Sequence, residues 1–156
     1  MTTRPATVDD VEAIAALVNR AYEVERFFVE GDRVTPAAVR QDLTTGEILI
    51  VTGADGALRA CVYVRVTGSR GYFGMLAVDP AEQGRGLGRA LIEDVEAYAR
   101  ARGASVMAIS VVHVRTELLA FYRRLGYVPT GTEPYVHRPV TQPVHFITME
   151  KALTAG

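Results

Sequence analysis

The sequence lacks several features by which whole classes of protein are recognised. Cys61 is the only cysteine among 156 residues, so no disulfide can form within the chain. The first residues contain no apolar signal segment, and the apolar runs at 72–78 and 106–112 are far shorter than the ~20 residues that span a bilayer. These absences predict a soluble, cytoplasmic protein with no membrane partner.

An excess of charge of one sign is also missing. The chain has 17 basic and 18 acidic residues and a formal net charge of −1, whereas a nucleic-acid-binding surface usually shows a basic excess. We therefore expect no nucleic acid partner. Because no repeat, low-complexity segment or Pro/Gly/Ser-rich linker divides the chain, residues 1–156 are predicted to form a single domain.

What the sequence does contain is a glycine-rich loop between an apolar run and a helix. Three glycines within five residues let the backbone come close to a ligand, and the free N–H groups at a helix N-terminus attract anions. Apolar residues at helical spacing from Leu87 to Tyr98 indicate the helix that follows. The loop predicts a site for a phosphate-bearing cofactor, and its residues are Gln83, Gly84, Arg85, Gly86, Leu87, Gly88 and Arg89.

The spacing of the glycines excludes two common nucleotide sites. In the dinucleotide pattern G-x-G-x-x-G, counting from Gly84 puts Arg89 at the third glycine, and counting from Gly86 puts Leu91 there. A P-loop needs Gly-Lys-Ser/Thr, but Lys151 is the only lysine. Both of these folds also place the loop after a first strand, whereas several strand-like segments precede this one.

Apolar periodicity and turn residues predict the other elements. The expected helix caps are Thr7 with Asp10, Thr35 before Pro36, and Thr116. The expected helices cover 11–21, 36–43, a segment from 87 that stops at Gly103, and 117–125. The expected strands cover 48–52, 58–67, 72–78, 106–112, 127–128 and 144–149, with 106–112 parallel to 72–78 across the glycine-loop helix.

Three separate blocks of sequence form a joint pattern. They are Leu76-Ala77-Val78-Asp79-Pro80, Gln83-x-x-Gly86-x-Gly88 and Phe121-Tyr122-x-x-Leu125-Gly126-Tyr127. In order and separation they resemble the GNAT superfamily of acyl-CoA-dependent N-acetyltransferases, and the resemblance extends loosely from Arg4 to Lys151. It implies an α/β fold: a mixed, mostly antiparallel central sheet of six to seven strands flanked by about four helices, with one parallel strand pair around the glycine-loop helix.

The resemblance also implies the reaction. It implies acetyl-CoA as co-substrate, no metal, and transfer of the acetyl group to a primary amine of a small molecule or peptide by direct attack in a ternary complex. One alternative is a non-catalytic acyl-CoA-binding regulatory module of the same fold, and another is a protein N-acetyltransferase. A homodimer formed by strand addition is compatible with such a sheet.

The resemblance assigns the cofactor contacts to two segments. The backbone of Leu76, Ala77 and Val78 would pair with the pantetheine arm like an added strand, and a free N–H there could stabilise the oxyanion. The N–H groups of Gly84, Arg85, Gly86, Gly88 and Arg89 would hold the pyrophosphate in a turn that Gln83 begins. The alternative is a tight strand-to-helix turn whose glycines are required only by sterics. The side chains of Arg85 and Arg89 either add charge at the phosphates or are merely solvated.

Tyr122 is the predicted catalytic residue. By resemblance it is the acid that protonates the departing thiolate, and hydrogen bonding in the transition state suffices for a phenol to do so. The alternative is an aromatic residue on the core face of its helix, because Leu118, Phe121 and Leu125 share that spacing. Seven residues earlier the family often has asparagine, where this chain has Arg115. Arg115, with Arg123 and Arg124, either reaches the nucleotide phosphates or forms a basic solvent face.

No single residue stands out as the general base. Some relatives use a glutamate where this chain has Tyr72, which is therefore expected to shape the pocket or hold a water. The remaining candidates are Glu23, Glu25, Glu30, Glu133, His113 and His145. Cys61 has no neighbouring histidine in the sequence and is expected to be an inert buried thiol.

Two segments are candidates for the acceptor site. Residues 23–30 mix three glutamates with Phe27 and Phe28, which suits a cationic amine with an apolar body, although an ordinary connection with buried phenylalanines has the same composition. Residues 131–143 are expected to form a long loop of the kind that often binds ligands, and the loop contains Glu133, Tyr135, His137 and Arg138.

Overall fold

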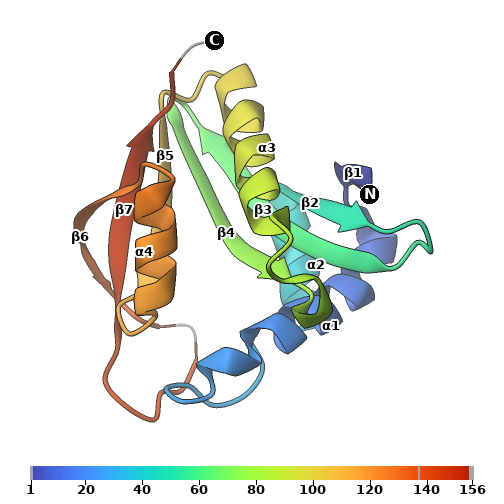
Figure 1. Ribbon diagram of the computed structural model, residues 1–156, viewed down its shortest axis with the longest axis horizontal. Helices are drawn as coiled ribbons and strands as arrows, with labels where there is room; N and C mark the ends of the chain where they lie inside the picture. Colours follow the sequence, from blue (N-terminus) through green and yellow to red (C-terminus); the bar gives the residue numbers. More distant parts are fainter. Residues whose placement is uncertain (1, 137, 155–156) are drawn as a thin grey trace.

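The computed structural model describes residues 2–136 and 138–154 and contains a seven-stranded mixed sheet (Figure 1). The strand order is β1-β2-β3-β4-β5-β7-β6, and only β4 and β5 run parallel as neighbours within the described residues. The predicted fold is confirmed, including the parallel pair. The strands are β1 (Thr2–Pro5), β2 (Glu47–Thr52), β3 (Leu58–Thr67), β4 (Arg70–Val78), β5 (Val106–Val112), β6 (Val128–Pro134) and β7 (His145–Ala152).

Helices cover both faces of the sheet. On one face α1 (Val11–Ala21) and α2 (Pro36–Thr45) pack on a buried cluster that includes Ile48, Cys61 and Tyr63. On the other face α3 (Leu87–Ala101) and α4 (Thr116–Arg124) pack on a second cluster that includes Val62 and Phe73. Successive residues of β3 therefore belong to different cores, as the pleat of a strand requires. Across the described part of the chain, no helix is long and apolar enough to cross a bilayer.

Two of the three predicted helix caps are confirmed. Thr7 and Asp10 form a capping box, in which the Thr7 N–H donates to Asp10 Oδ2 at 2.8 Å, and α1 follows a short 3-10 turn. Thr35 Oγ1 accepts a hydrogen bond from the Ala38 N–H at 3.1 Å. Thr116 is not a cap: it is the first residue of α4, because the carbonyl of Arg115 already accepts the N–H groups of residues 118 and 119.

The parallel strands β4 and β5 are paired over only a short stretch and then diverge. Register pairs join β4 to β5 only from Arg70 to Tyr72, so beyond Tyr72 one edge of β4 has no neighbouring strand. Between Gly74 and Ala77 β4 contains one more residue than the facing segment of β3, and Met75 adopts a left-handed φ of 55°. The bulge and the separation open a space between β4 and β5 in the middle of the sheet.

Two strands differ from the sequence-based expectation. β1 was not predicted, because four residues ending in a proline are too short to show an apolar alternation. β6 extends to Pro134, so residues 131–134 of the expected 131–143 loop belong to a strand. β6 is an exposed edge strand paired only with β7, a position that tolerates Pro129 and Pro134. His137 lies outside the described residues.

Candidate active site

Two cavities meet beside the opening between β4 and β5. The first, which we call the glycine-loop cleft, has a volume of about 440 Å³ and lies between the glycine loop, the end of β4 and α4. The second, which we call the β4–β5 cavity, has a volume of about 350 Å³ and is lined by both strands and by side chains from β3 and β6. The residues that line both are Tyr22, Leu76, Leu118 and Tyr122.

The glycine loop presents unpaired backbone N–H groups to its cleft. Gly84 and Gly86 have φ values of 84° and 80°, a left-handed conformation that favours glycine. The first hydrogen bond of α3 runs from the Ala90 N–H to the Gly86 carbonyl at 3.0 Å, and no protein acceptor in the described chain reaches the N–H groups of residues 87–89. A Cβ at Gly84 or Gly86 would meet nothing within 4 Å, so this part of the loop faces open space.

Nearly all of the predicted cofactor residues line the glycine-loop cleft. The exception is Arg85, whose side chain is 66% exposed and contacts Glu82 Oε2 at 3.3 Å. Arg89 lines the cleft, with its Nε 3.5 Å from Glu93. The residues that the structure brings together there are Leu76, Ala77, Val78, Gln83, Gly84, Gly86, Leu87, Gly88 and Arg89.

Tyr122 lies where the two cavities meet. Its ring packs in the core against Phe73 and Tyr127, with centroids 6.0 Å and 5.9 Å away, so the core-face alternative describes the ring correctly. Its hydroxyl group has no hydrogen-bond partner among the described residues and remains free to bond a ligand. Burial raises the pKa of Tyr122 above its ordinary value and nearby Tyr22 raises it further, so the hydroxyl keeps its proton.

Tyr22 is a site residue that the sequence reasoning missed. Its hydroxyl donates to the Leu76 carbonyl at 3.1 Å, and burial raises its pKa to about 12. It directly follows α1 and lines both cavities. No spacing pattern identifies it, because its partner Leu76 lies 54 positions along the chain.

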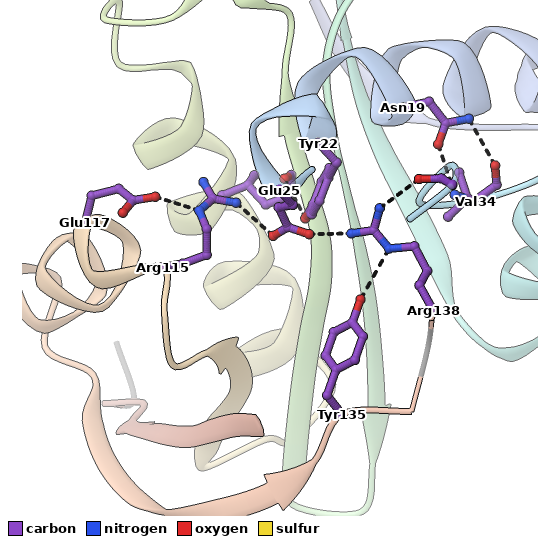
Figure 2. A network of polar contacts seen from close by, with 10 residues as sticks. Asn19, Tyr22, Glu25, Val34, Arg115, Glu117, Tyr135 and Arg138 are labelled. Carbon is purple, nitrogen blue, oxygen red and sulfur yellow. Dashed lines mark hydrogen bonds and ion pairs between the residues drawn. The ribbon is translucent and has the colours of Figure 1, made fainter. Parts of the chain in front are cut away.

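A buried ionic network joins the two sides of the site, as Figure 2 shows. The Glu25 carboxylate accepts from Arg115 Nη1 at 2.8 Å and from Arg138 Nη2 at 2.5 Å, and the three side chains are only 5%, 12% and 6% exposed. Arg115 also bonds Glu117, and Arg138 Nε donates to the Tyr135 hydroxyl at 3.2 Å. The prediction of a basic solvent face is therefore wrong for Arg115, which is an internal ion-pair partner.

Comparisons with known proteins agree with this geometry. The family model described as the acetyltransferase (GNAT) family matches residues 12–127, which is more than half of the chain. The chain belongs to the GNAT family. Mycothiol acetyltransferase of Beutenbergia cavernae is 37% identical to it over 84 residues, which cover 53% of this chain and 28% of that protein. The chain spans between 28% and 54% of the length of the curated relatives it matches.

Solved structures share the GNAT fold over nearly the whole chain. The ribosomal-protein-S18-alanine N-acetyltransferase from Escherichia coli superposes with a TM-score of 0.83 at 19% identity, covering 99% of this chain and 95% of that one. A phosphinothricin acetyltransferase from Sinorhizobium meliloti in complex with AcCoA superposes with a TM-score of 0.79 at 17% identity, covering 99% and 89%. These TM-scores show a common fold.

In this GNAT chain some of the candidate general bases line the β4–β5 cavity and others do not. Glu133 lines the β4–β5 cavity, and its carboxylate makes no hydrogen bond or ion pair with the described residues. Glu25 also lines this cavity, but both of its oxygens are bound by guanidinium groups. Glu23 and Glu30 are exposed and line neither cavity. Tyr72 lines the β4–β5 cavity, as expected for a residue that shapes the pocket.

The two histidine candidates and Cys61 lie outside both cavities. His113 and His145 stack on each other with centroids 4.0 Å apart, and the His145 N–H donates to His113 Nδ1 at 3.2 Å. Cys61 is fully buried against the core beneath α1, and burial raises the pKa of its thiol to about 12. An inert buried thiol is the interpretation that these surroundings support.

The segment 23–30 does not form the predicted acidic and aromatic wall. Phe28 is fully buried against Val29 and Val112, Phe27 is 53% exposed, and neither ring lines the glycine-loop cleft or the β4–β5 cavity. Of this segment only Glu25 lines the β4–β5 cavity, and its charge is already paired. The alternative of an ordinary connection with buried phenylalanines is correct for Phe28.

Proposed function

We propose that this chain is an N-acetyltransferase that transfers the acetyl group of acetyl-CoA to a primary amine of a small molecule or peptide by direct attack. The observation that carries the proposal is the meeting of two cavities at Tyr22, Leu76 and Tyr122. Two reactants that enter from opposite sides can come together there without a covalent enzyme intermediate. Holding both in one site is worth effective molarities of about 10⁵–10⁸ M in well-oriented systems.

Two features of the glycine-loop cleft support coenzyme A as its ligand. The unpaired N–H groups of residues 87–89, at the positive end of a 15-residue helix, suit a diphosphate. The edge of β4 that β5 leaves unpaired, ending at Leu76, Ala77 and Val78, offers main-chain groups to an extended pantetheine arm. The crystal structure of the Sinorhizobium meliloti relative in complex with AcCoA supports this choice of co-substrate.

The chain's own residues supply the proton transfers that direct attack requires. When bound, acetyl-CoA supplies an activated thioester. As the carbon–nitrogen bond forms and the carbon–sulfur bond breaks, the Tyr122 hydroxyl donates a proton to the departing sulfur. An ammonium acceptor must first lose one proton, which Glu133, the unpaired carboxylate among the lining residues, accepts directly or through water. As the amide forms, the nitrogen loses a second proton, which returns to the Tyr122 oxygen and restores its hydroxyl group. A main-chain N–H on the β4 edge would stabilise the oxyanion.

Release of free thiol from acetyl-CoA, measured across amines, amino acids, peptides and aminoglycosides, tests this proposal. We expect release that depends on one class of amine, with the acetylated amine detected by mass spectrometry. Repeating the screen with longer acyl-CoAs sets the acyl length. Coenzyme binding without thiol release from any amine would instead identify a non-catalytic acyl-CoA-binding module. An acetyl group trapped on Cys61 would contradict direct transfer.

A further inference from the structure

The β4–β5 cavity is lined by two arginines that have no ion-pair partner among the described residues, the half-buried Arg33 and the exposed Arg65. Arg33 and Arg65 both line the cavity, and neither guanidinium forms a hydrogen bond or an ion pair with any described residue. The guanidinium carbon of Arg33 lies 5.3 Å from the centroid of the Tyr22 ring, and that of Arg65 lies 4.5 Å from the centroid of the Tyr72 ring. Stacking on an aromatic ring orients a guanidinium while leaving its in-plane N–H groups free.

Both arginines are held by ordered parts of the fold. Arg65 is a residue of β3 and pairs in register with Tyr72 of β4. Next to Arg33, the backbone of Val34 is bound in both directions by Asn19 of α1: Asn19 Nδ2 donates to the Val34 carbonyl at 3.0 Å, and the Val34 N–H donates to Asn19 Oδ1 at 3.0 Å (Figure 2). Arg65 is thus held by the sheet, and Arg33 by the loop that Asn19 binds at Val34.

The two positive charges act on the same neighbours. Burial raises the pKa values of Tyr72 and Asp42, and in both cases Arg33 and Arg65 together partly offset the rise. Within the described residues no ion pair of 4.0 Å or less joins Asp42 to either guanidinium, so this carboxylate acts on them from a greater distance. The two arginines therefore act on the same part of the cavity.

The other charged side chains that line the cavity do not pair with these two arginines in the described part of the structure. Glu25 is neutralised by Arg115 and Arg138, so the one unpaired carboxylate among the lining residues is Glu133. Among the lining residues two unpaired cations face one unpaired anion, and Asp42, which lies outside the lining, is a second carboxylate that senses both arginines. The free N–H groups on the lining are therefore those of the two guanidiniums. They favour an acceptor that brings its own negative group.

We infer that the acceptor amine carries an acid group, a carboxylate or a phosphonate-type oxyanion, which Arg33 and Arg65 bind. The inference deepens the proposed function by naming the acceptor class: a compact amino acid or aminoalkyl acid, consistent with a cavity of about 350 Å³. The acid group lies against Arg33 and Arg65, and the amine points to the junction at Tyr122. The acidic segment 23–30 does not select a polycationic acceptor, because its cavity-lining carboxylate is already paired.

Matched substrate series test the inference. Thiol release from acetyl-CoA is measured with an amino acid, its carboxamide and its decarboxylated amine, for several side chains, and with 2-aminoethylphosphonate against ethanolamine. The proteins are wild type, Arg33→Gln, Arg65→Gln and the control Arg40→Gln, an exposed residue of α2 that lines neither cavity. Thermal melting verifies that each variant is folded.

The expected result is a preference for the acid-bearing member of each series. Its kcat/KM should fall about 10- to 100-fold in Arg33→Gln and in Arg65→Gln, the range for loss of a hydrogen bond to a charged group, and stay unchanged in Arg40→Gln. The carboxamide should lose little in any variant. Comparison of the carboxylate and phosphonate arms identifies which oxyanion is bound. Equal or better turnover of the uncharged partners would overturn the inference while leaving the acetyltransferase proposal intact.

A binding measurement separates failure of the inference from failure of the proposed function. The same acids and carboxamides are titrated by calorimetry into the wild type and the variants in the presence of CoA. If no amine releases thiol, acid binding that is lost in Arg33→Gln and Arg65→Gln still supports the subsite. Acids that bind no more tightly than their carboxamides, or equally well to the variants, overturn it whether or not thiol is released.

Discussion

Tyr122 illustrates how one residue can belong to the core and to the site at once. The residue is 7% exposed and its ring packs against Phe73 and Tyr127, while it lines both cavities and its hydroxyl group has no hydrogen-bond partner among the described residues. The sequence offers these as alternatives, because the helical spacing of Phe121 and Leu125 describes a core face and only the family resemblance describes a catalytic hydroxyl. The structure accommodates both, and the catalytic role stays a prediction.

Replacing Tyr122 by phenylalanine removes the proton donor and keeps the ring. We expect kcat to fall about 100-fold, the lower range for a lost general acid, with little change in coenzyme affinity. Because burial raises the pKa of Tyr122 above its ordinary value of ~10, the wild type should keep its proton donor, and its kcat, up to at least about pH 10. Steady-state kinetics from pH 6 to 10 check both statements; equal turnover by Tyr122→Phe throughout would remove this residue from the mechanism.

Glu25 is the residue on which the buried ionic network depends. Glu25→Ala leaves Arg115 and Arg138 buried without their shared partner, so we expect the free energy of unfolding to fall by about 3–5 kcal/mol. Glu23 lies in the same short 3-10 helix as Glu25, Tyr22–Glu25, but is exposed, so Glu23→Ala should stay within about 0.5 kcal/mol of the wild type. Urea denaturation of the two variants measures the difference, and similar midpoints would show that the network contributes little.

At the scale of elements, the glycines of the loop and of α3 are of two kinds. Some are favoured by the backbone conformation, and one would be needed only to leave room for a ligand. Gly84 and Gly86 have positive φ values, so a side chain there strains the backbone by about 1–2 kcal/mol. Gly88 differs, because its φ is ordinary and a Cβ would lie 3.8 Å from Val78 Cγ2 and 3.9 Å from Leu76 Cδ2, which is normal packing distance. The protein itself can therefore accept alanine at 88, and any need for glycine there comes from the ligand.

Gly88→Ala should therefore leave the fold stable and weaken coenzyme binding. Alanine favours a helix over glycine by up to about 1 kcal/mol, so the melting temperature should stay level or rise. The affinity for acetyl-CoA should fall about tenfold or more, because the new methyl group lies in the cleft lined by the loop. Gly131→Ala, on the exposed edge strand β6, is the control. A drop in stability with unchanged affinity would favour the purely steric role of the loop.

For the whole molecule, local patterns predicted the elements better than the contacts between them. Thr7, Thr35 and the apolar spacing of α1 and α3 are local signals, and the helices they predicted are confirmed. β1 and β6 were missed or shortened, since edge strands rich in proline and threonine show no apolar alternation. That residues 1–156 form a single domain stays a prediction.

The charged contacts of the site could not be read from the sequence. Glu25 and Arg138 lie 113 positions apart, and Glu25 and Arg115 lie 90 apart, so no spacing rule links them. A carboxylate in an acidic segment looks available to a ligand until its buried partners are known. The same holds for Arg33 and Arg65, which become a candidate subsite only because the fold brings both to one cavity.

The outer edges of the sheet bear on the predicted homodimer. β1 and β6 end the sheet, and both contain prolines: Pro5 in β1, Pro129 and Pro134 in β6. Proline lacks the N–H that pairing of another strand would use, which disfavours strand addition at either edge. A homodimer by this route therefore stays a prediction with little support from the sheet itself.

The central claim is that main-chain N–H groups of the glycine loop bind the diphosphate of coenzyme A. Isothermal titration calorimetry with acetyl-CoA and with S-acetylpantetheine, which lacks the diphosphate and the nucleotide, tests it most directly. The account predicts binding of acetyl-CoA at least about 100-fold tighter than of S-acetylpantetheine, because several hydrogen bonds to a charged group are lost. No heat with acetyl-CoA, or equal affinity for the two compounds, would contradict it.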